Sequence, residues 1–149
     1  MMHSVRSIAC ALLLLPALTV QAGGDKVRIE GAWARATAPG QAVGAAYMTL
    51  TSRDDLTLIK VESPAAEFVE IHKMSMRNGI MEMRMLEELK LPAGQTVKLE
   101  PGGFHLMLID LKKPLQDGTS VAFTLHLKDA AGKTSLQGVS APVSKSRPE

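Results

Sequence analysis

The chain has 149 residues, of which 46% are hydrophobic and 3% aromatic, and its formal net charge at pH 7 is +2. This length fits one domain behind a short leader. A nearly neutral chain with so few aromatic residues has no electrostatic footprint for nucleic acid, so we expect no nucleic-acid partner.

The first residues, 1–22, predict a signal peptide. Arg6 precedes an apolar run over residues 7–20, and the segment ends in Val-Gln-Ala, the small-x-Ala pattern that signal peptidase cleaves. The run is too short for a membrane span, and no later stretch approaches the roughly 20 apolar residues that a span requires. We therefore expect cleavage after Ala22 and a single domain, residues 23–149, with a net charge of +1 and a periplasmic location.

The only cysteine, Cys10, lies inside this leader. A lipoprotein anchor on Cys10 is the alternative, but Ser7-Ile8-Ala9 lacks the usual leucine three residues before the cysteine, and most of the apolar run follows it. After cleavage the chain has no thiol, and therefore no disulfide and no cysteine nucleophile. The same absence excludes a blue-copper site, which needs a cysteine thiolate.

Turn-forming residues recur every eight to twelve positions, a spacing typical of an all-β sandwich or barrel. The clearest strand is 119–128, where Val121, Phe123, Leu125 and Leu127 alternate with small or polar residues. No segment after the leader has a convincing helical period. In chain order, the predicted strands are 27–35, 44–52, 55–62, 67–76, 80–88, 95–100, 104–111, 119–128 and 133–139.

The dipeptide Asn78-Gly79 predicts a tight hairpin, because both residues readily adopt the positive φ angles of a type I′ turn. A two-residue turn there fixes the register of the flanking strands, and side chains two residues apart share a face. One face then carries only His and Met, in the pairs Met76 with Met81, Met74 with Met83, and His72 with Met85. The opposite face is polar: Lys73, Ser75, Arg77, Glu82 and Arg84.

The predicted strand 104–111 places His105 and Met107 on one side, since they are two residues apart. The window 72–107 holds six of the seven methionines and two of the three histidines that follow the leader. Imidazole and thioether suit Cu(I), a soft d¹⁰ ion, whereas Zn(II) favours imidazole, thiolate and carboxylate. The residue types therefore indicate a soft-metal site.

The spacing of four of these residues reproduces a family signature, H-x10-M-x21-H-x-M, and the chain resembles the PCuAC family of periplasmic copper chaperones. The segments RATAPGQ at 35–41, GAAYM at 44–48 and PGGFHLML at 101–108 extend the resemblance over nearly all of the chain after the leader. The resemblance implies a cupredoxin-like Greek-key β-barrel. It also implies one Cu(I) per chain, bound by His72, Met83, His105 and Met107.

The resemblance further implies a copper chaperone for the assembly of cytochrome c oxidase copper centres. Its acceptor would be a protein such as oxidase subunit II, or a thiol-containing copper-relay protein. Two departures limit the transfer: Lys73 stands where many members have a methionine, and the chain ends without the His/Met-rich tail of some members. We therefore expect a single site, in a monomer.

Methionine also fills irregular cores well, so the other methionines are interpreted first as packing residues, with Met85 or Met74 as a spare ligand. His126 is interpreted as structural or superficial. We expect no enzyme, because the sequence has no phosphate loop, no nucleophile elbow and no positioned pair of carboxylates. Two other functions stay open: a copper-independent β-sandwich module that contacts a protein through its methionines, and periplasmic copper storage or resistance.

Overall fold

The computed structural model describes residues 24–149, which form ten β-strands and no helix. The predicted signal peptide, its cleavage site and Cys10 lie outside the described residues. The strands are β1 (Val27–Arg35), β2 (Val43–Ser52), β3 (Leu56–Glu62), β4 (Ala66–Arg77), β5 (Ile80–Leu86), β6 (Leu89–Leu91), β7 (Thr96–Leu99), β8 (Phe104–Leu111), β9 (Ser120–Asp129) and β10 (Thr134–Ser144).

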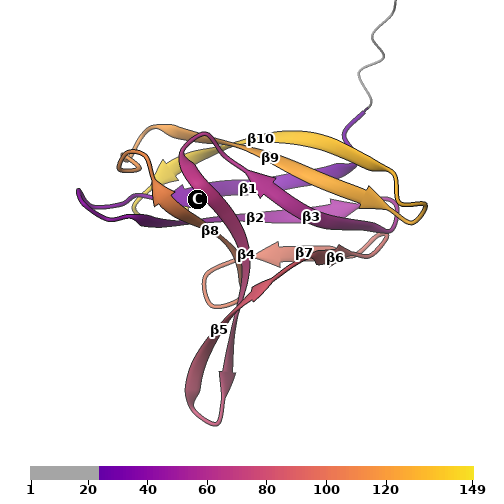
Figure 1. Cartoon of the computed structure of the whole chain (residues 1–149), viewed down its shortest axis with the longest axis horizontal. Coiled ribbons are helices and arrows are strands. Elements are labelled where there is room, and N and C mark those ends of the chain that lie inside the picture. Colours follow the sequence, from indigo (N-terminus) through magenta and orange to yellow (C-terminus); the bar gives the residue numbers. More distant parts are fainter. Residues whose placement is uncertain (1–23) are drawn as a thin grey trace, which may run out of the picture.

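The strands close into a barrel (Figure 1). Around the ring the order is β4-β8-β7-β2-β1-β10-β9-β3, and β3 returns to β4 through the pair Val61 and Val69. Most neighbours run antiparallel, while β1 with β10 and β7 with β8 are parallel. The all-β class predicted from the turn spacing is confirmed.

Two strand ends differ from the prediction by more than one residue. The strand expected over 80–88 ends at Leu86, and a separate short strand, β6, pairs with β3. Leu89 and Leu91 of β6 are buried, whereas β5 is largely exposed, so the chain changes partner where its side chains enter the core. The last strand continues to Ser144 instead of ending at residue 139, because its far end also pairs with β1.

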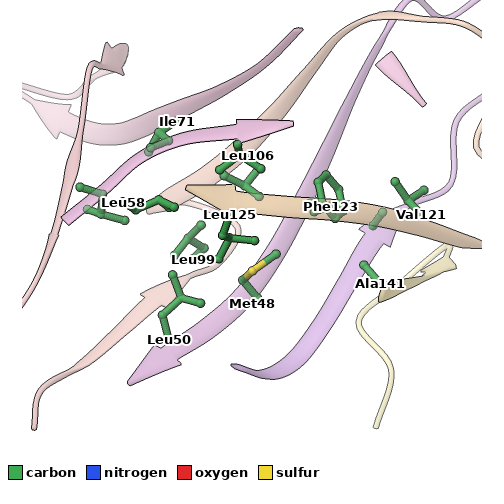
Figure 2. Close-up of a cluster of buried hydrophobic side chains, with 14 of the residues drawn as sticks. Met48, Leu50, Leu58, Ile71, Leu99, Leu106, Val121, Phe123, Leu125 and Ala141 are labelled. Atoms are coloured by element: carbon green, nitrogen blue, oxygen red, sulfur yellow. The ribbon is translucent and has the colours of Figure 1, made fainter. Parts of the chain in front are cut away.

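The barrel interior is filled by alternate residues of the strands, as their period of two predicts. Figure 2 shows labelled side chains of β2, β8 and β9 gathered in this core, among them Met48, Leu106 and Phe123. Leu106 and Leu108 of β8 are fully buried and hold this strand against the core. The residues that alternate with them point to the opposite face of β8. The packing interpretation of Met48 is confirmed, since it is 2% exposed.

One hairpin extends beyond the barrel, and we call residues 74–83 the hairpin arm (Figure 1). Strand β4 pairs with β8 only as far as Lys73, opposite Phe104, and from there its strand partner is β5 alone. The arm therefore has one layer, with both faces outside the core.

Candidate metal centre

The turn at the tip of the arm has the predicted geometry. Asn78 and Gly79 both have positive φ angles, 50° and 76°, as a type I′ turn requires. The observed register pairs Met76 with Met81, Met74 with Met83 and His72 with Met85. The predicted hairpin is therefore confirmed pair by pair.

Strand β8 brings the second histidine alongside the first. His72 of β4 lies directly opposite His105 of β8, and the two ring centroids are 5.7 Å apart with an interplanar angle of 51°. Met107 follows two residues later on β8, opposite Ala45 of β2. Neighbouring side chains on one face of paired strands can contact each other, so this register places the imidazoles and a thioether together.

A shallow hollow of about 270 Å³ lies where the arm joins the barrel. Met83, His105 and Met107, three of the four predicted ligands, line it, and so does Met74. His72 borders this group through its contact with the His105 ring but does not line the hollow itself. The other lining residues are Arg35, Ala45, Tyr47, Pro101 and Gly102.

The hydrogen bond of His72 decides which of its nitrogens is free. Its Nε2 lies 2.7 Å from Oε2 of Glu70, and a carboxylate only accepts, so Nε2 carries the proton. Its Nδ1 is buried and has no hydrogen-bond partner. A buried polar atom without a partner typically costs about 1–3 kcal/mol, and a lone pair in this state is suited to a metal ion.

His105 is fixed in the opposite tautomer. Its Nδ1 donates to the backbone oxygen of Gly103 at 3.1 Å, which leaves Nε2 as the nitrogen with a free lone pair. Gly103 ends a turn in which its N–H donates to the oxygen of Glu100 at 3.0 Å and Gly102 has a φ of 85°. The same oxygen of Gly103 accepts the N–H of Met74 at 3.0 Å, so one carbonyl holds both His105 and the base of the arm.

The donor set suits a soft ion. The two histidines each present one unprotonated nitrogen, and the thioethers around them carry no proton and no charge. Within residues 24–149 there is no group of three or more His, Cys, Asp or Glu side chains that would hold a metal ion. Whatever metal fits here must therefore accept thioether, which Cu(I) does and Mg²⁺ or Ca²⁺ does not.

Several residues differ in importance from their sequence-based interpretation. Glu70 and Gly103 were missed, although each lies two residues before a predicted ligand and the spacing i, i+2 on a strand was the available signal. Met74 lines the hollow, whereas Met85 does not. His126 does not line the hollow, and its Nε2 lies 2.6 Å from Oε2 of Glu62. This ion-pair contact fits the structural interpretation of His126.

The chain matches a known protein family over most of its length. The model of the LpqE-like family matches residues 27–143. The chain belongs to the LpqE-like family. A relative from Leifsonia xyli subsp. xyli, named as lipoprotein Lxx21020, is 33% identical over 108 residues. That alignment spans 72% of this chain and 65% of the relative, so the chain matches just under two thirds of the relative's length.

Solved structures of the same shape are PCuAC domains. The copper-bound PCuAC domain from PmoF2 superposes with a TM-score of 0.65 and 26% identity, over 82% of this chain and 95% of that one. Apo-DR1885 from Deinococcus radiodurans has a TM-score of 0.60 and 32% identity, over 98% and 97%. Its Cu(I) form has a TM-score of 0.56 and 34% identity, over 77% and 76%. The PCuAC resemblance and the cupredoxin-like fold are confirmed.

Among the described residues, no helix is long and apolar enough to cross a membrane.

Proposed function

We propose that this protein is an exported copper chaperone that binds one Cu(I) per chain through His72, Met83, His105 and Met107. The observation that carries the proposal is the buried, unpartnered Nδ1 of His72 beside the ring of His105, next to a hollow lined by thioethers. A Cu(I) ion bound between them would give that nitrogen its partner. The copper-bound PmoF2 domain and Cu(I)-DR1885, which share the fold, support the choice of metal.

The chemistry of the side chains favours Cu(I) over Cu(II). Thioether is a soft ligand, and the described residues contain no cysteine that would oxidise to a disulfide outside the cytoplasm. The carboxylate of Glu70 lies one hydrogen bond behind His72. It would stabilise positive charge on the imidazole and raise its basicity as a ligand.

Exposure of the site suits transfer. Met83 is 47% exposed while His105 is 5% exposed, so one ligand faces water and another is held in the barrel wall. An acceptor that docks on the arm would replace the exposed thioether first. Copper would then move by stepwise ligand exchange, with no proton leaving the methionine sulfur, and the protein needs no catalytic group.

The destination in this proposal is the copper centres of cytochrome c oxidase, reached through subunit II or through a thiol-containing relay protein. The likeness to PCuAC domains supports a chaperone role, and the names of the LpqE-like relatives support export. We further propose a periplasmic location after cleavage at Ala22, and a monomer as the working unit.

Delivery is tested by mixing the copper-loaded protein with the apo copper-binding domain of oxidase subunit II, with and without a reduced thiol-containing relay protein. We expect copper to appear in the acceptor. In cells, deletion of the gene should lower oxidase activity, and added copper should restore it. If deletion instead raises copper sensitivity and leaves oxidase activity intact, the protein stores copper and the delivery proposal is wrong.

A further inference from the structure

The hairpin arm exposes more methionine than the proposed site uses. Met76 is 66% exposed and Met81 is 61% exposed, at the far end of the arm from the hollow. Neither lines the hollow, and neither belongs to the core. Exposed apolar side chains that cluster in this way mark a site that binds a partner protein or a ligand.

The register of the hairpin brings these two sulfurs together. In a two-residue hairpin the residues that flank the turn, Arg77 and Ile80, exchange both backbone hydrogen bonds. Pairs alternate along the ladder, so Met76 and Met81 form a non-hydrogen-bonded pair, the kind whose side chains lie closer together. A pair of thioethers therefore stands at the tip of the arm.

The next pair toward the barrel is of the same kind. Met74 and Met83 lie two residues further along each strand, on the same face, roughly 7 Å away by the rise of a β-strand. This second pair lines the hollow together with His105 and Met107. Thioether pairs thus form a continuous row from the exposed tip to the proposed copper site.

The other face of the arm has a different chemistry. Arg77 lies there with Glu82, whose carboxylate is 4.0 Å from Arg77, and the pair Lys73 and Arg84 continues this face just outside the arm. The methionine face between Met74 and Met83 contains no carboxylate, imidazole or thiol. A metal ion that binds the tip must therefore accept thioether alone, and a soft monovalent ion is the class that does.

We propose that Met76 and Met81 form an outer, weak site for Cu(I), which receives the ion and passes it to Met74 and Met83 on the way to the inner site. The inference rests on the proposed function, because it supplies the route into that site. At each step one sulfur–copper bond forms as another breaks. Copper stays Cu(I) throughout, and thioether sulfur has no proton to release.

The test uses Ag(I), a d¹⁰ ion that does not change oxidation state, and the whole exported chain with ¹³C-labelled methionine methyl groups. The inner site is disabled in the double variant His72→Ala, His105→Ala. We expect Ag(I) to shift the methyl signals of Met76 and Met81 in this variant, while the signal of the core residue Met48 stays fixed. The variants Met76→Leu and Met81→Leu assign the two signals and each should weaken the effect.

Loading kinetics give the second readout. In the chain with an intact inner site, Met76→Leu together with Met81→Leu should slow Ag(I) loading by roughly threefold or more, because the tip no longer concentrates the ion beside the inner site. The affinity of the inner site should stay the same. The matched control is Ile80→Leu, which changes an equally exposed apolar residue on the other face.

The outcomes separate the two proposals. If the tip methyl signals do not move and loading is unchanged, the outer site is wrong, while tight binding at the intact inner site leaves the chaperone proposal in place. If the Met76 and Met81 variants weaken only the binding of an acceptor protein, the tip is a protein-contact surface and the outer site is again wrong. If the intact chain binds neither Ag(I) nor Cu(I) at His72 and His105, the proposed function itself fails.

Discussion

Glu70 accepts a hydrogen bond from Nε2 of His72 at 2.7 Å, and the Nδ1 of the same ring is buried without a partner. The carboxylate thus determines which nitrogen of His72 carries the proton and which is free. Because both residues lie on β4, two positions apart, the arrangement is built into one strand. It makes Glu70 a positioning residue for a proposed ligand.

Replacing Glu70 by leucine should therefore weaken Cu(I) binding by roughly tenfold or more, since partners of this kind typically contribute 10–100-fold to metal affinity. Glu70→Gln should restore most of the affinity, because its amide oxygen still accepts from Nε2. The measurements are Cu(I) affinity and the ¹⁵N shifts of the His72 ring, which report the tautomer. Equal affinity and one unchanged tautomer in all three proteins would show that Glu70 does not position the ring.

Local chemistry explains how much of the site was predictable. Asn78-Gly79 fixed the turn, the turn fixed the register, and the register placed Met74, Met83 and His72 on one face, as the structure has them. The expected all-β class followed from turn spacing and strand alternation, whereas the barrel was implied by the family resemblance. These are interactions between residues close in sequence, which a sequence pattern reports directly.

The features that local patterns do not report depend on contacts across the chain. A shared site for His72 and His105 was expected from the family resemblance, and the closeness of the two rings comes from the pairing of β4 with β8, which no local pattern specifies. The separate strand β6 arises because Leu89 and Leu91 enter a core formed by distant strands. The role of Gly103 depends on the position of its backbone oxygen, which accepts hydrogen bonds from both Met74 and His105. No local sequence pattern gives this position.

The arm's turn predicts a local effect of mutation. Gly79→Ala places a side chain at a φ of 76° in open space, so the cost is backbone strain of about 1–2 kcal/mol. Because the arm lies outside the barrel, amide exchange at Ser75 and Glu82 should speed up while the barrel core stays protected. Gly24→Ala, which also enters open space but without a positive φ, is the control. Unchanged exchange in the arm would contradict the turn assignment.

The cluster of Glu62 with Lys60 and His126 predicts a pH effect away from the site. Hydrogen bonds from Lys60, first, and then from His126 lower the pKa of Glu62 from 4.5. A carboxyl with a lowered folded-state pKa contributes stability above its unfolded pKa and loses it as the pH falls through its folded pKa. Glu62 is 50% exposed, so the contribution is small.

Carboxyl ¹³C titration should therefore show that Lys60→Met raises the pKa of Glu62 toward its ordinary value, and that His126→Ala raises it less. His126→Ala should leave Cu(I) affinity unchanged. A loss of copper binding in that variant would mean that His126 belongs to the site.

The leader gives a prediction that mass spectrometry decides. We expect the exported protein to begin at Gly23, after cleavage behind Ala22, because residues 20–22 fit the signal peptidase pattern. The variant Cys10→Ser should then be exported and released as before. A mature chain that begins at Cys10 and carries a lipid would contradict this expectation and would agree with the name of the Leifsonia xyli relative.

We propose above that His72, Met83, His105 and Met107 bind one Cu(I) per chain. An anaerobic titration against a competing colorimetric Cu(I) chelator measures both the metal-to-protein ratio and the affinity. We expect one tightly held copper, with binding lost or strongly weakened in His105→Ala, weakened in Met83→Leu and unchanged in His126→Ala. If the unaltered protein takes Cu(I) from the chelator no better than the His105→Ala variant does, the proposed site is wrong.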